Sequence, residues 1–396
     1  MKPLVLIALL SICTPAYASG PELFGMGPRP AALAGAGVAD GEGWDQAYTN
    51  PAGLVDAKRR RLSLGYLGAR YSLTLDGSKR SITPTNGILL GAVLPIPFGG
   101  VLRDRVVLGL AFYFPTELIT RARAPYPETP RLALLDDRTQ VVSVVVSAGF
   151  RLHSRVELGV GVLALAALVG EIVIATDAGG SATTLSNQEL VTRLSPIIGL
   201  RVRATDRLRF GLVYRAESKA EYDVTILTNL GPRLPINVPA LFLRGVAQYD
   251  PHQLHLEAAV KLGPATLLVG LDWKHWSGYP IPSQNPTKGA PVQPDPGLHD
   301  TVVPRLAVEA SRSLAHGLTL VGRLGYAYEL SPADPRTTSA YVDADRHVLG
   351  FGGGLSWVRG RAGLHLDLVG QWQHLSRAER TSGNLGVFGA TIGIDL

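Results

Sequence analysis

Few residues of this chain stand at spacings that would let them catalyse a reaction. The sequence has no G-x-S-x-G or H-E-x-x-H motif, its nine histidines are scattered, and His252 with His255 lacks an acidic or cysteine partner at ligand spacing. A phospholipase triad assembled from distant residues stays open as an alternative. Otherwise we expect a protein that is no enzyme and that holds neither a cofactor nor a metal ion.

Glycine-rich runs and basic residues do not match a nucleotide or nucleic-acid site. The runs at 35–43 and 350–354 do not lie in a strand-helix-strand unit, as a dinucleotide loop would. The formal charge of +6 is spread along the chain, with one cluster at 58–61. Nothing resembles a nucleic-acid-binding stripe, so we expect no nucleic-acid partner.

Arginines recur on one side of several apolar segments. From 207 to 219 every second residue belongs to a largely charged face, and the residues between them are mainly apolar. Such an arginine would bind an acidic ligand; the alternative, an ion pair with an acidic neighbour, is the expectation for most of them. The arginines on the polar face of their segments are Arg193, Arg201, Arg203, Arg209, Arg215, Arg244, Arg305 and Arg323.

The first eighteen residues predict an export signal. An apolar run from Leu4 to Ile12 follows Lys2, and residues 16–18 read A-Y-A, an A-x-A cleavage site. The run is too short to span a bilayer as a helix. We therefore expect residues 1–18 to be cleaved. The only cysteine, Cys13, lies among them, so the mature chain would have no thiol.

The rest of the chain is hydrophobic without a helical membrane span. Hydrophobic residues make up 46% of the sequence and the mean hydropathy is +0.17, yet no later stretch approaches the roughly eighteen uninterrupted apolar residues of a spanning helix. Apolar and polar residues alternate instead, as at 318–330, 364–374 and 388–396. Only helices and closed barrels satisfy every backbone group in lipid. The pattern predicts an all-β protein, a transmembrane antiparallel β-barrel whose charged side faces inward.

About fourteen segments alternate in this way, an even number as in bacterial barrels. One of them, 240–262, is doubtful because residues 250–252 form either a bulge or a turn. Short connections alternate with long ones at 115–138, 278–300 and 331–345, which places the short turns and both ends of the barrel in the periplasm. The expected strands are 61–75, 85–97, 105–114, 139–152, 155–175, 189–204, 207–227, 240–262, 266–277, 301–313, 317–330, 346–358, 361–374 and 385–396.

The glycine-rich segment 19–60 does not look like strand and is compact enough to pack inside a barrel. Its motifs from Gly35 to Asp40 and from Asn50 to Leu54 resemble the N-terminal hatch of the FadL-type outer-membrane transporters, a family of long-chain fatty acid and aromatic hydrocarbon channels. The segments 334–337 and 343–352 resemble a late loop and strand of that family. The resemblance spans essentially the whole mature chain.

This resemblance implies three segments: a signal peptide at 1–18, a hatch or plug at 19–60 and a barrel at 61–396 of the bacterial outer membrane. It implies transport of hydrophobic small molecules, long-chain fatty acids first among them. Capture between extracellular loops would precede transfer to a lumen pocket and lateral exit through the wall. The alternatives are a porin for polar solutes and a barrel phospholipase. Besides the solute, the expected partners are outer-membrane lipid and lipopolysaccharide, and we expect a monomer.

Candidate site residues follow from loop 115–138, from strand 105–114, which is apolar on both faces, and from the hatch. Pro196 sits inside an expected strand, where its missing N–H would break the ladder and adjoin a wall opening. The candidate hatch and gating residues are Trp44, Asn50, Pro51, Ala52 and Pro196, although Asn50 and Pro51 also fit a plain turn. The candidate substrate-binding residues are Leu118, Ile119, Tyr126, Leu132, Leu135, Phe112, Arg215 and Arg323.

Overall fold

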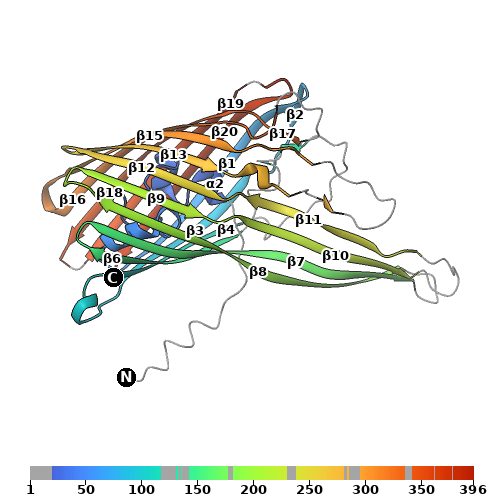
Figure 1. The fold of residues 1–396 in the computed structure, drawn as a ribbon, viewed down its shortest axis with the longest axis horizontal. Coiled ribbons are helices and arrows are strands. Elements are labelled where there is room, and N and C mark those ends of the chain that lie inside the picture. Colours follow the sequence, from blue (N-terminus) through green and yellow to red (C-terminus); the bar gives the residue numbers. More distant parts are fainter. Residues whose placement is uncertain are drawn as a thin grey trace.

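The wall of the molecule is a closed antiparallel barrel of fourteen strands, as the alternation predicts (Figure 1). The computed structural model describes residues 20–396 except 117–130, 133–134, 136–141, 177–181, 230–237, 281–282, 285–294, 335–340, 361 and 377. The export signal expected at 1–18 therefore lies outside the described residues. The fourteen strands, in their order around the wall, are β1 (Arg61–Leu75), β3 (Thr85–Pro95), β4 (Val106–Pro115), β6 (Ser143–His153), β7 (Val156–Thr176), β8 (Ala182–Arg203), β9 (Leu208–Arg215), β12 (Gln253–Leu262), β13 (Ala265–Lys274), β15 (Thr301–Ser313), β16 (Leu318–Glu329), β18 (Arg346–Arg359), β19 (Ala362–Leu375) and β20 (Thr381–Asp395).

The first and last strands of the wall pair with each other and close the ring. β1 and β20 run antiparallel in register from Arg61↔Asp395 to Leu75↔Thr381. On its other edge, β1 pairs with β3. Every wall strand thus has two neighbours over at least part of its length, which closes the ring.

Two of the expected strands, 207–227 and 240–262, are each broken in two, which corrects the sequence prediction. β9 ends at Arg215 and β10 (Ser218–Asn229) follows, while β11 (Leu241–Asp250) ends where the doubtful residues 250–252 form a turn before β12. β9 and β12 pair directly in the wall. The two breaks thus remove one hairpin, β10–β11, from the wall, and its strand number stays even.

The β10–β11 hairpin joins the upper halves of β7 and β8 in a sheet that extends beyond the rest of the barrel (Figure 1). β10 runs parallel to β7 from Tyr222↔Leu168 to Asn229↔Ala175. The remaining short elements lie in the connections between wall strands. They are β2 (Ser78–Arg80), β5 (Arg131–Leu132), β14 (Ser283–Gln284), β17 (Tyr341–Val342), η2 (Gly100–Leu102), η3 (Trp276–Gly278) and η4 (Ala315–Gly317).

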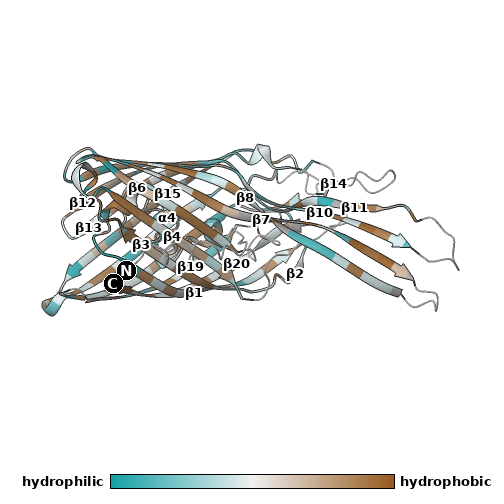
Figure 2. Ribbon diagram, turned by 90° about the horizontal axis from the view of Figure 1, so that it is seen from below, coloured by the Kyte–Doolittle hydropathy of each residue, from teal (hydrophilic) through white to brown (hydrophobic). Residues whose placement is uncertain are grey.

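The outer face of the wall is apolar, as the lipid-facing side of a barrel must be. Along β20, Ile392 and Ile394 are 54% and 53% exposed, whereas Val387 between the outward positions is buried. Trp273, Trp357 and Trp372 also lie exposed on this face near strand ends. Figure 2 shows hydrophobic bands around the barrel. A closed barrel with such a face fits a protein of the bacterial outer membrane.

The N-terminal segment fills the lumen instead of adding to the wall. It consists of four short helices, α2 (Gly20–Phe24), α3 (Pro28–Ala32), α4 (Gln46–Thr49) and the 3₁₀ helix η1 (Pro51–Asp56). Figure 1 shows these helices inside the barrel. None of the described helices is long and apolar enough to cross a membrane. We call residues 20–60 the hatch, as the sequence led us to expect.

Candidate functional site

The hatch is seated against a series of wall glycines that face the lumen. A Cβ atom added to Gly109 of β4 would lie 2.6 Å from a side-chain carbon of Leu54, and one added to Gly149 of β6 would lie 2.7 Å from the Pro51 carbonyl oxygen. The backbone of the hatch therefore approaches the wall more closely than any other residue would allow. The wall glycines in contact with the hatch are Gly91, Gly109, Gly149, Gly159, Gly199, Gly211, Gly325, Gly350 and Gly352.

Three of these glycines stand side by side on neighbouring strands. Gly149 of β6 pairs with Gly159 of β7, which in turn pairs with Gly199 of β8. This row was not predicted from the sequence, where glycine runs were weighed only as nucleotide loops. Its signal was present nonetheless, because the glycines fall on the inward phase of strands whose other residues alternate.

The motif at 50–52 lies on this row and has a structural role. Asn50 is fully buried, and its side-chain oxygen accepts a hydrogen bond of 3.1 Å from the Ala52 N–H, which caps η1. Its Nδ2 donates to the carbonyl oxygens of Val38 at 2.8 Å and Leu200 at 3.3 Å. Asn50 thus ties two parts of the hatch to β8, a more specific role than a plain turn.

Ion pairs and charged hydrogen bonds fasten the hatch to the wall on several sides. Asp56 of the hatch pairs with Arg201 of β8 at 2.6 Å, and Arg29 of the hatch pairs with Glu309 of β15 at 3.1 Å. Glu257 of β12 accepts the backbone N–H groups of residues 37 and 39, both at 2.8 Å. A buried ion pair costs several kcal/mol when one partner is removed, so these contacts hold the hatch in place.

All eight arginines singled out from the sequence have a carboxylate within 4 Å, which confirms the ion-pair alternative. Arg215 lies over the ring of Tyr48, 4.8 Å from its centroid, and its closest carboxylate is Glu22 of the hatch at 3.8 Å. Arg323 pairs with Glu309 and Asp367, each at 2.5 Å. As candidate substrate ligands, both are already engaged by the protein.

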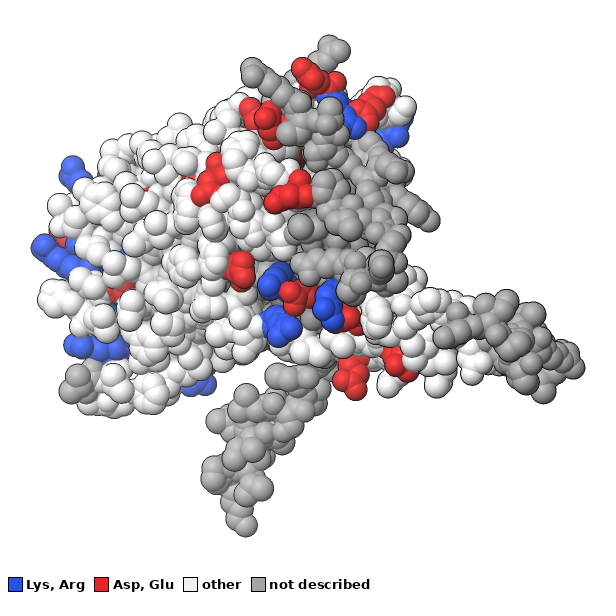
Figure 3. Space-filling view, turned by 45° about the vertical axis from the view of Figure 1, so that its right-hand side comes forward, with Lys and Arg blue, Asp and Glu red and all other residues white. Residues whose placement is uncertain are grey.

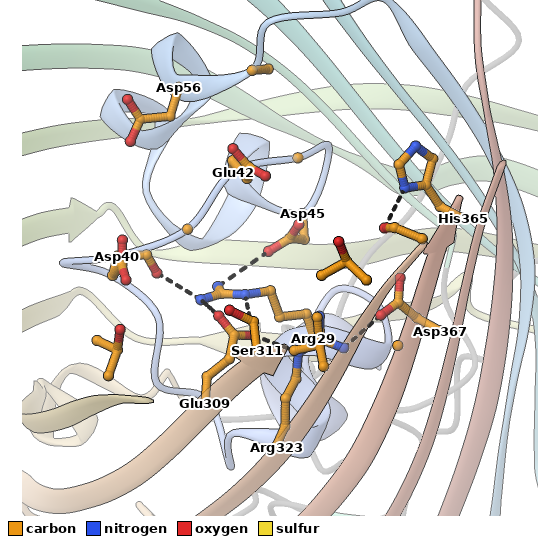
Figure 4. A pocket seen from close by; sticks show the side chains of 18 of the residues that line it. Arg29, Asp40, Glu42, Asp45, Asp56, Glu309, Ser311, Arg323, His365 and Asp367 are labelled. Atoms are coloured by element: carbon orange, nitrogen blue, oxygen red, sulfur yellow. Dashed lines mark hydrogen bonds and ion pairs between the residues drawn. The ribbon is translucent and has the colours of Figure 1, made fainter. Parts of the chain in front are cut away.

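Below the hatch, toward the short turns, lies a cavity of about 810 Å³ that we call the vestibule. Its lining is strongly charged and comes from both the hatch and the wall, as Figure 4 shows for Arg29, Asp45, Glu309, Arg323 and Asp367. A cavity of this size and polarity holds water. The vestibule is therefore a wet space at the end of the barrel that carries the short turns.

Above the hatch, toward the long connections, one part of the lumen is filled by buried apolar side chains. Trp44 and Tyr48 of the hatch belong to this group, and both are 7% exposed. We call the group the apolar cluster, and no charged residue is among its members. The wall and loop residues of the apolar cluster include Leu67, Leu73, Leu89, Tyr113, Leu132, Leu135, Val145, Leu163, Ile197, Leu375, Leu385 and Val387. Another part of the lumen holds a buried ionic group, in which Lys274 pairs with Glu22 at 2.8 Å and with Glu329 at 2.6 Å, and Glu329 also pairs with Arg346 at 2.5 Å.

The substrate-binding residues expected from the sequence are only partly brought together. Leu132 and Leu135 are buried in the apolar cluster, whereas Leu118, Ile119 and Tyr126 lie outside the described residues. Phe112 is placed on the outer face of β4, beside Phe114, and does not face the lumen. Because β4 is apolar on both faces, alternation could not orient it, and Tyr113 takes the inward position.

At Pro196 the wall loses one of its hydrogen-bonded ladders. β8 pairs with β7 on both sides of this residue, but the β8–β9 register ends at Ile197↔Arg215. The Pro196 carbonyl oxygen still accepts the Ala216 N–H at 3.0 Å. N and O of one strand residue point to the same edge, so the missing N–H of Pro196 faces β9. Beyond this point the chain of β9 turns away into β10.

A small cavity adjoins this break. It measures about 10 Å³ and is lined by Tyr48 of the hatch, by Leu163 and Pro196, and by residues from the start of β10 and the end of β11. This is room for about one water molecule. The break is thus the place where the apolar cluster, the hatch and the rim of the wall meet.

Two groups of Ser, His and Asp bear on the phospholipase alternative. His365 lies in the vestibule wall (Figure 4). Ser356 is 2.9 Å from its Nδ1, and Asp395 is 3.1 Å from its Nε2. Ser356 is paired in register with β16 on one side and β19 on the other. Its neighbouring amides are therefore used by the ladders and cannot form the oxyanion hole of a serine hydrolase.

The second group lies near the outer rim, where Ser277 and Asp300 both approach Nδ1 of His275, at 3.3 and 3.1 Å. A triad needs the serine and the acid on opposite ring nitrogens, so this group has no relay. Ser277 also donates to Asp300 through its N–H and hydroxyl, which holds the pKa of that carboxyl down at about 2. Among the described residues, no three His, Cys, Asp or Glu side chains are grouped as metal ligands.

Comparison with known proteins finds relatives by structure but none by sequence. No protein-family model matches the chain, and no curated protein matches it. Similar solved structures do exist, and they cover nearly the whole chain. A FadL homologue of Pseudomonas aeruginosa is 15% identical with a TM-score of 0.60, over 93% of this chain and 97% of that one.

Two toluene transporters have the same architecture. TodX of Pseudomonas putida is 13% identical with a TM-score of 0.55, over 96% of this chain and 99% of its own. TbuX of Ralstonia pickettii is 15% identical with a TM-score of 0.54, over 94% and 99%. At these identities the likeness establishes a shared fold, and it agrees with the resemblance to FadL-type transporters found in the sequence.

Proposed function

We propose that this barrel carries hydrophobic compounds across the outer membrane, with long-chain fatty acids as the substrate class to test first. In this route, loop residues such as Leu118, Ile119 and Tyr126 capture the solute outside the cell. It then enters the apolar cluster above the hatch. It leaves sideways through the wall, into the hydrocarbon of the membrane.

The difference between the two sides of the hatch carries the proposal. A methylene group is more stable by about 0.8 kcal/mol in apolar surroundings than in water. The apolar cluster offers such surroundings, and the charged, wet vestibule does not. A straight path through the barrel would therefore be uphill for an apolar solute. An exit into lipid keeps the solute in apolar surroundings throughout.

The break in the wall at Pro196 supports a particular exit. It lies beside the apolar cluster, because Leu163 and Ile197 belong to the cluster and also line the small cavity at the break. The β8–β9 ladder ends there, so widening the gap would break only the hydrogen bonds from the Ala216 N–H to Pro196 and from the Ser195 hydroxyl to Glu217 on that side. Small movements of Tyr48 and of the chain at 216–218 would open it.

The similar solved structures agree with this function. They are toluene transporters and a monoaromatic hydrocarbon channel of the same fold. Aromatic hydrocarbons are accordingly the second substrate class to test. A cell lacking this protein should lose uptake of labelled oleate, of labelled toluene, or of both. Unchanged uptake of both compounds would refute the proposed function.

Liposome swelling tests the porin alternative. The hatch occupies the lumen and is bonded to the wall, so the reconstituted barrel should not admit sugars at the rate of an open porin. Swelling as fast as that of a general porin would favour the polar-solute function. A second assay, hydrolysis of a phospholipid reporter, should show no activity above that of empty liposomes.

A disulfide across the break tests the exit. The Ser195 hydroxyl donates to the Glu217 carbonyl oxygen at 2.7 Å, so these two residues are in contact across the break. The pair Ser195→Cys with Glu217→Cys is designed to join β8 to the chain that follows β9. Since the only cysteine is Cys13, wrong pairing is avoided. Oxidation should reduce uptake, and a reducing agent should restore it.

The matched control is a bridge within an intact ladder. Ala310 of β15 and Gly322 of β16 are register partners, so Ala310→Cys with Gly322→Cys joins strands that are already paired. This bridge should leave uptake unchanged. If the bridge at 195 and 217 forms and uptake also stays unchanged, the exit is not at this break.

A further inference from the structure

The short turns at the periplasmic end of the barrel carry a marked excess of basic residues. Their described residues include only two exposed acids, Asp104 and Asp206. The resulting excess of positive charge is larger than the formal +6 of the whole chain. We call these basic side chains the basic rim, and its exposed members are Lys58, Arg60, Arg103, Arg105, Arg155, Arg207, Lys261, Arg312 and Arg359.

The basic rim differs from the lumen in that its charges are not neutralised. Each of the eight lumen and loop arginines considered above has a carboxylate partner, as Arg201 has in Asp56 and Glu157. No member of the basic rim forms an ion pair with any residue that the structure describes. Figure 3 shows Lys and Arg gathered at this end of the barrel, next to a wall almost without charge.

Exposed leucines lie next to these cations. Leu102 precedes Arg103 and is 50% exposed, and Leu262 follows Lys261 and is 58% exposed. Leu152 and Leu314, close to Arg155 and Arg312, are also exposed, as is Phe98 in the first of these turns. An apolar side chain beside a long cationic one suits the boundary between hydrocarbon and headgroups. There the leucine enters the apolar layer and the cation reaches the polar one.

We propose that the basic rim binds anionic phospholipid headgroups of the periplasmic leaflet, such as those of phosphatidylglycerol. The charges need a negative partner, and the leucines place that partner at the edge of the hydrocarbon. A soluble acidic protein would satisfy the charges but leave the leucines of the turns in water. The cations are also spread around the circumference, as annular lipids are. This inference does not depend on which solute the barrel transports.

Spin-labelled lipids test this proposal on the full barrel in phosphatidylcholine vesicles. Electron spin resonance gives the fraction of labelled lipid that is immobilised at the protein surface. Labelled phosphatidylglycerol should associate roughly fivefold better than labelled phosphatidylcholine, the ratio that corresponds to one basic side chain near an anionic surface. Added salt should lower this preference, because the rim is exposed.

The decisive variant neutralises four arginines of the basic rim that do not line the vestibule: Arg103→Gln, Arg155→Gln, Arg312→Gln and Arg359→Gln. Its lipid preference should fall clearly below that of the unchanged protein, although five members of the basic rim remain. A matched control removes four exposed charges from the opposite end and should keep the preference: Arg70→Gln, Lys79→Gln, Arg193→Gln and Arg244→Gln.

Resistance of both variants to unfolding in detergent shows that the barrels are intact. Equal association of the two lipids with the unchanged protein would overturn the proposal and leave an acidic soluble partner as the alternative. A preference that survives undiminished in the first variant, or that the control loses equally, would overturn it as well.

Discussion

Above the hatch, leucine, valine, tyrosine and tryptophan side chains fill part of the lumen beside a closed group of buried ion pairs, whereas below it a cavity of about 810 Å³ is lined by paired acids and arginines. The same fourteen strands supply both linings, since most wall strands run past the hatch. One barrel can therefore hold a dry and a wet compartment, provided that a plug separates them.

A charge placed in the apolar cluster should be far more harmful than one placed in the vestibule. Leu163→Lys would bury a cation without a partner, which we expect to destabilise the barrel by about 5 kcal/mol. Unfolding by urea in lipid vesicles measures this loss. The control, Ser311→Lys, adds the same charge at an exposed position that lines the vestibule. Equal losses in the two variants would contradict the contrast.

Removing the cation that joins the hatch to β8 should weaken the barrier that the hatch forms between the apolar cluster and the vestibule. Arg201 is 2% exposed and pairs with Glu157 at 2.5 Å and with Asp56 at 2.6 Å. Arg201→Gln should cost about 3 to 4 kcal/mol, because two acids lose their buried partner. It should also raise ion conductance in planar bilayers. Arg193→Gln, which breaks an exposed pair with Glu221, should change stability by less than about 1 kcal/mol.

The buried Asp343, between β17 and β18, makes the extracellular end sensitive to pH. Burial raises the pKa of Asp343 from 3.8 to about 6. The protonated Asp343 carboxyl therefore contributes most to the free energy of unfolding below pH 4. This contribution, up to about 3 kcal/mol, is lost as the pH rises through 6. Hydrogen exchange of residues 341–346 should accelerate over that range. Asp343→Asn should abolish the dependence, and a pH profile that persists in this variant would exclude Asp343 as its source.

A side chain at the glycine row should displace the hatch at the lowest cost of the four changes. A Cβ at Gly159 would collide with the backbone of Ala52. Gly159→Val should destabilise the barrel by about 1 to 3 kcal/mol through overpacking, and its conductance should rise. Gly322→Val is the control, because nothing lies within 4 Å of that position. A closed, fully stable Gly159→Val barrel would show that the seat tolerates side chains.

The wall could be predicted from the sequence because each strand carries its own evidence. A residue that faces lipid must be apolar, so alternation reports the fold without any knowledge of the neighbouring strands. The closed ring of fourteen strands and the paired arginines were expected on this basis, whereas the hatch was expected from its glycine-rich sequence and from the family resemblance. Where both faces are apolar the method fails, as it did for Phe112.

The two broken strands could not be predicted in the same way. The alternation from Arg207 to Lys219 continues through residues 216 and 217 without a change of phase. What changes there is the partner, from β8 to β7, and a single sequence does not report partners. The glycine row lay on the inward phase of its strands, but its meaning required the position of the hatch.

The pairing of β1 with β20 also has a kinetic consequence. Residues such as Arg61 and Asp395, which lie more than three hundred positions apart in the chain, have to meet before the ring can close. Contacts of such long range form slowly, because the loop entropy is lost before the pairing is gained. Until then the apolar outer faces of twelve other strands lack their final surroundings. We therefore expect the unfolded polypeptide to need chaperones that keep it from aggregating on the way to the membrane.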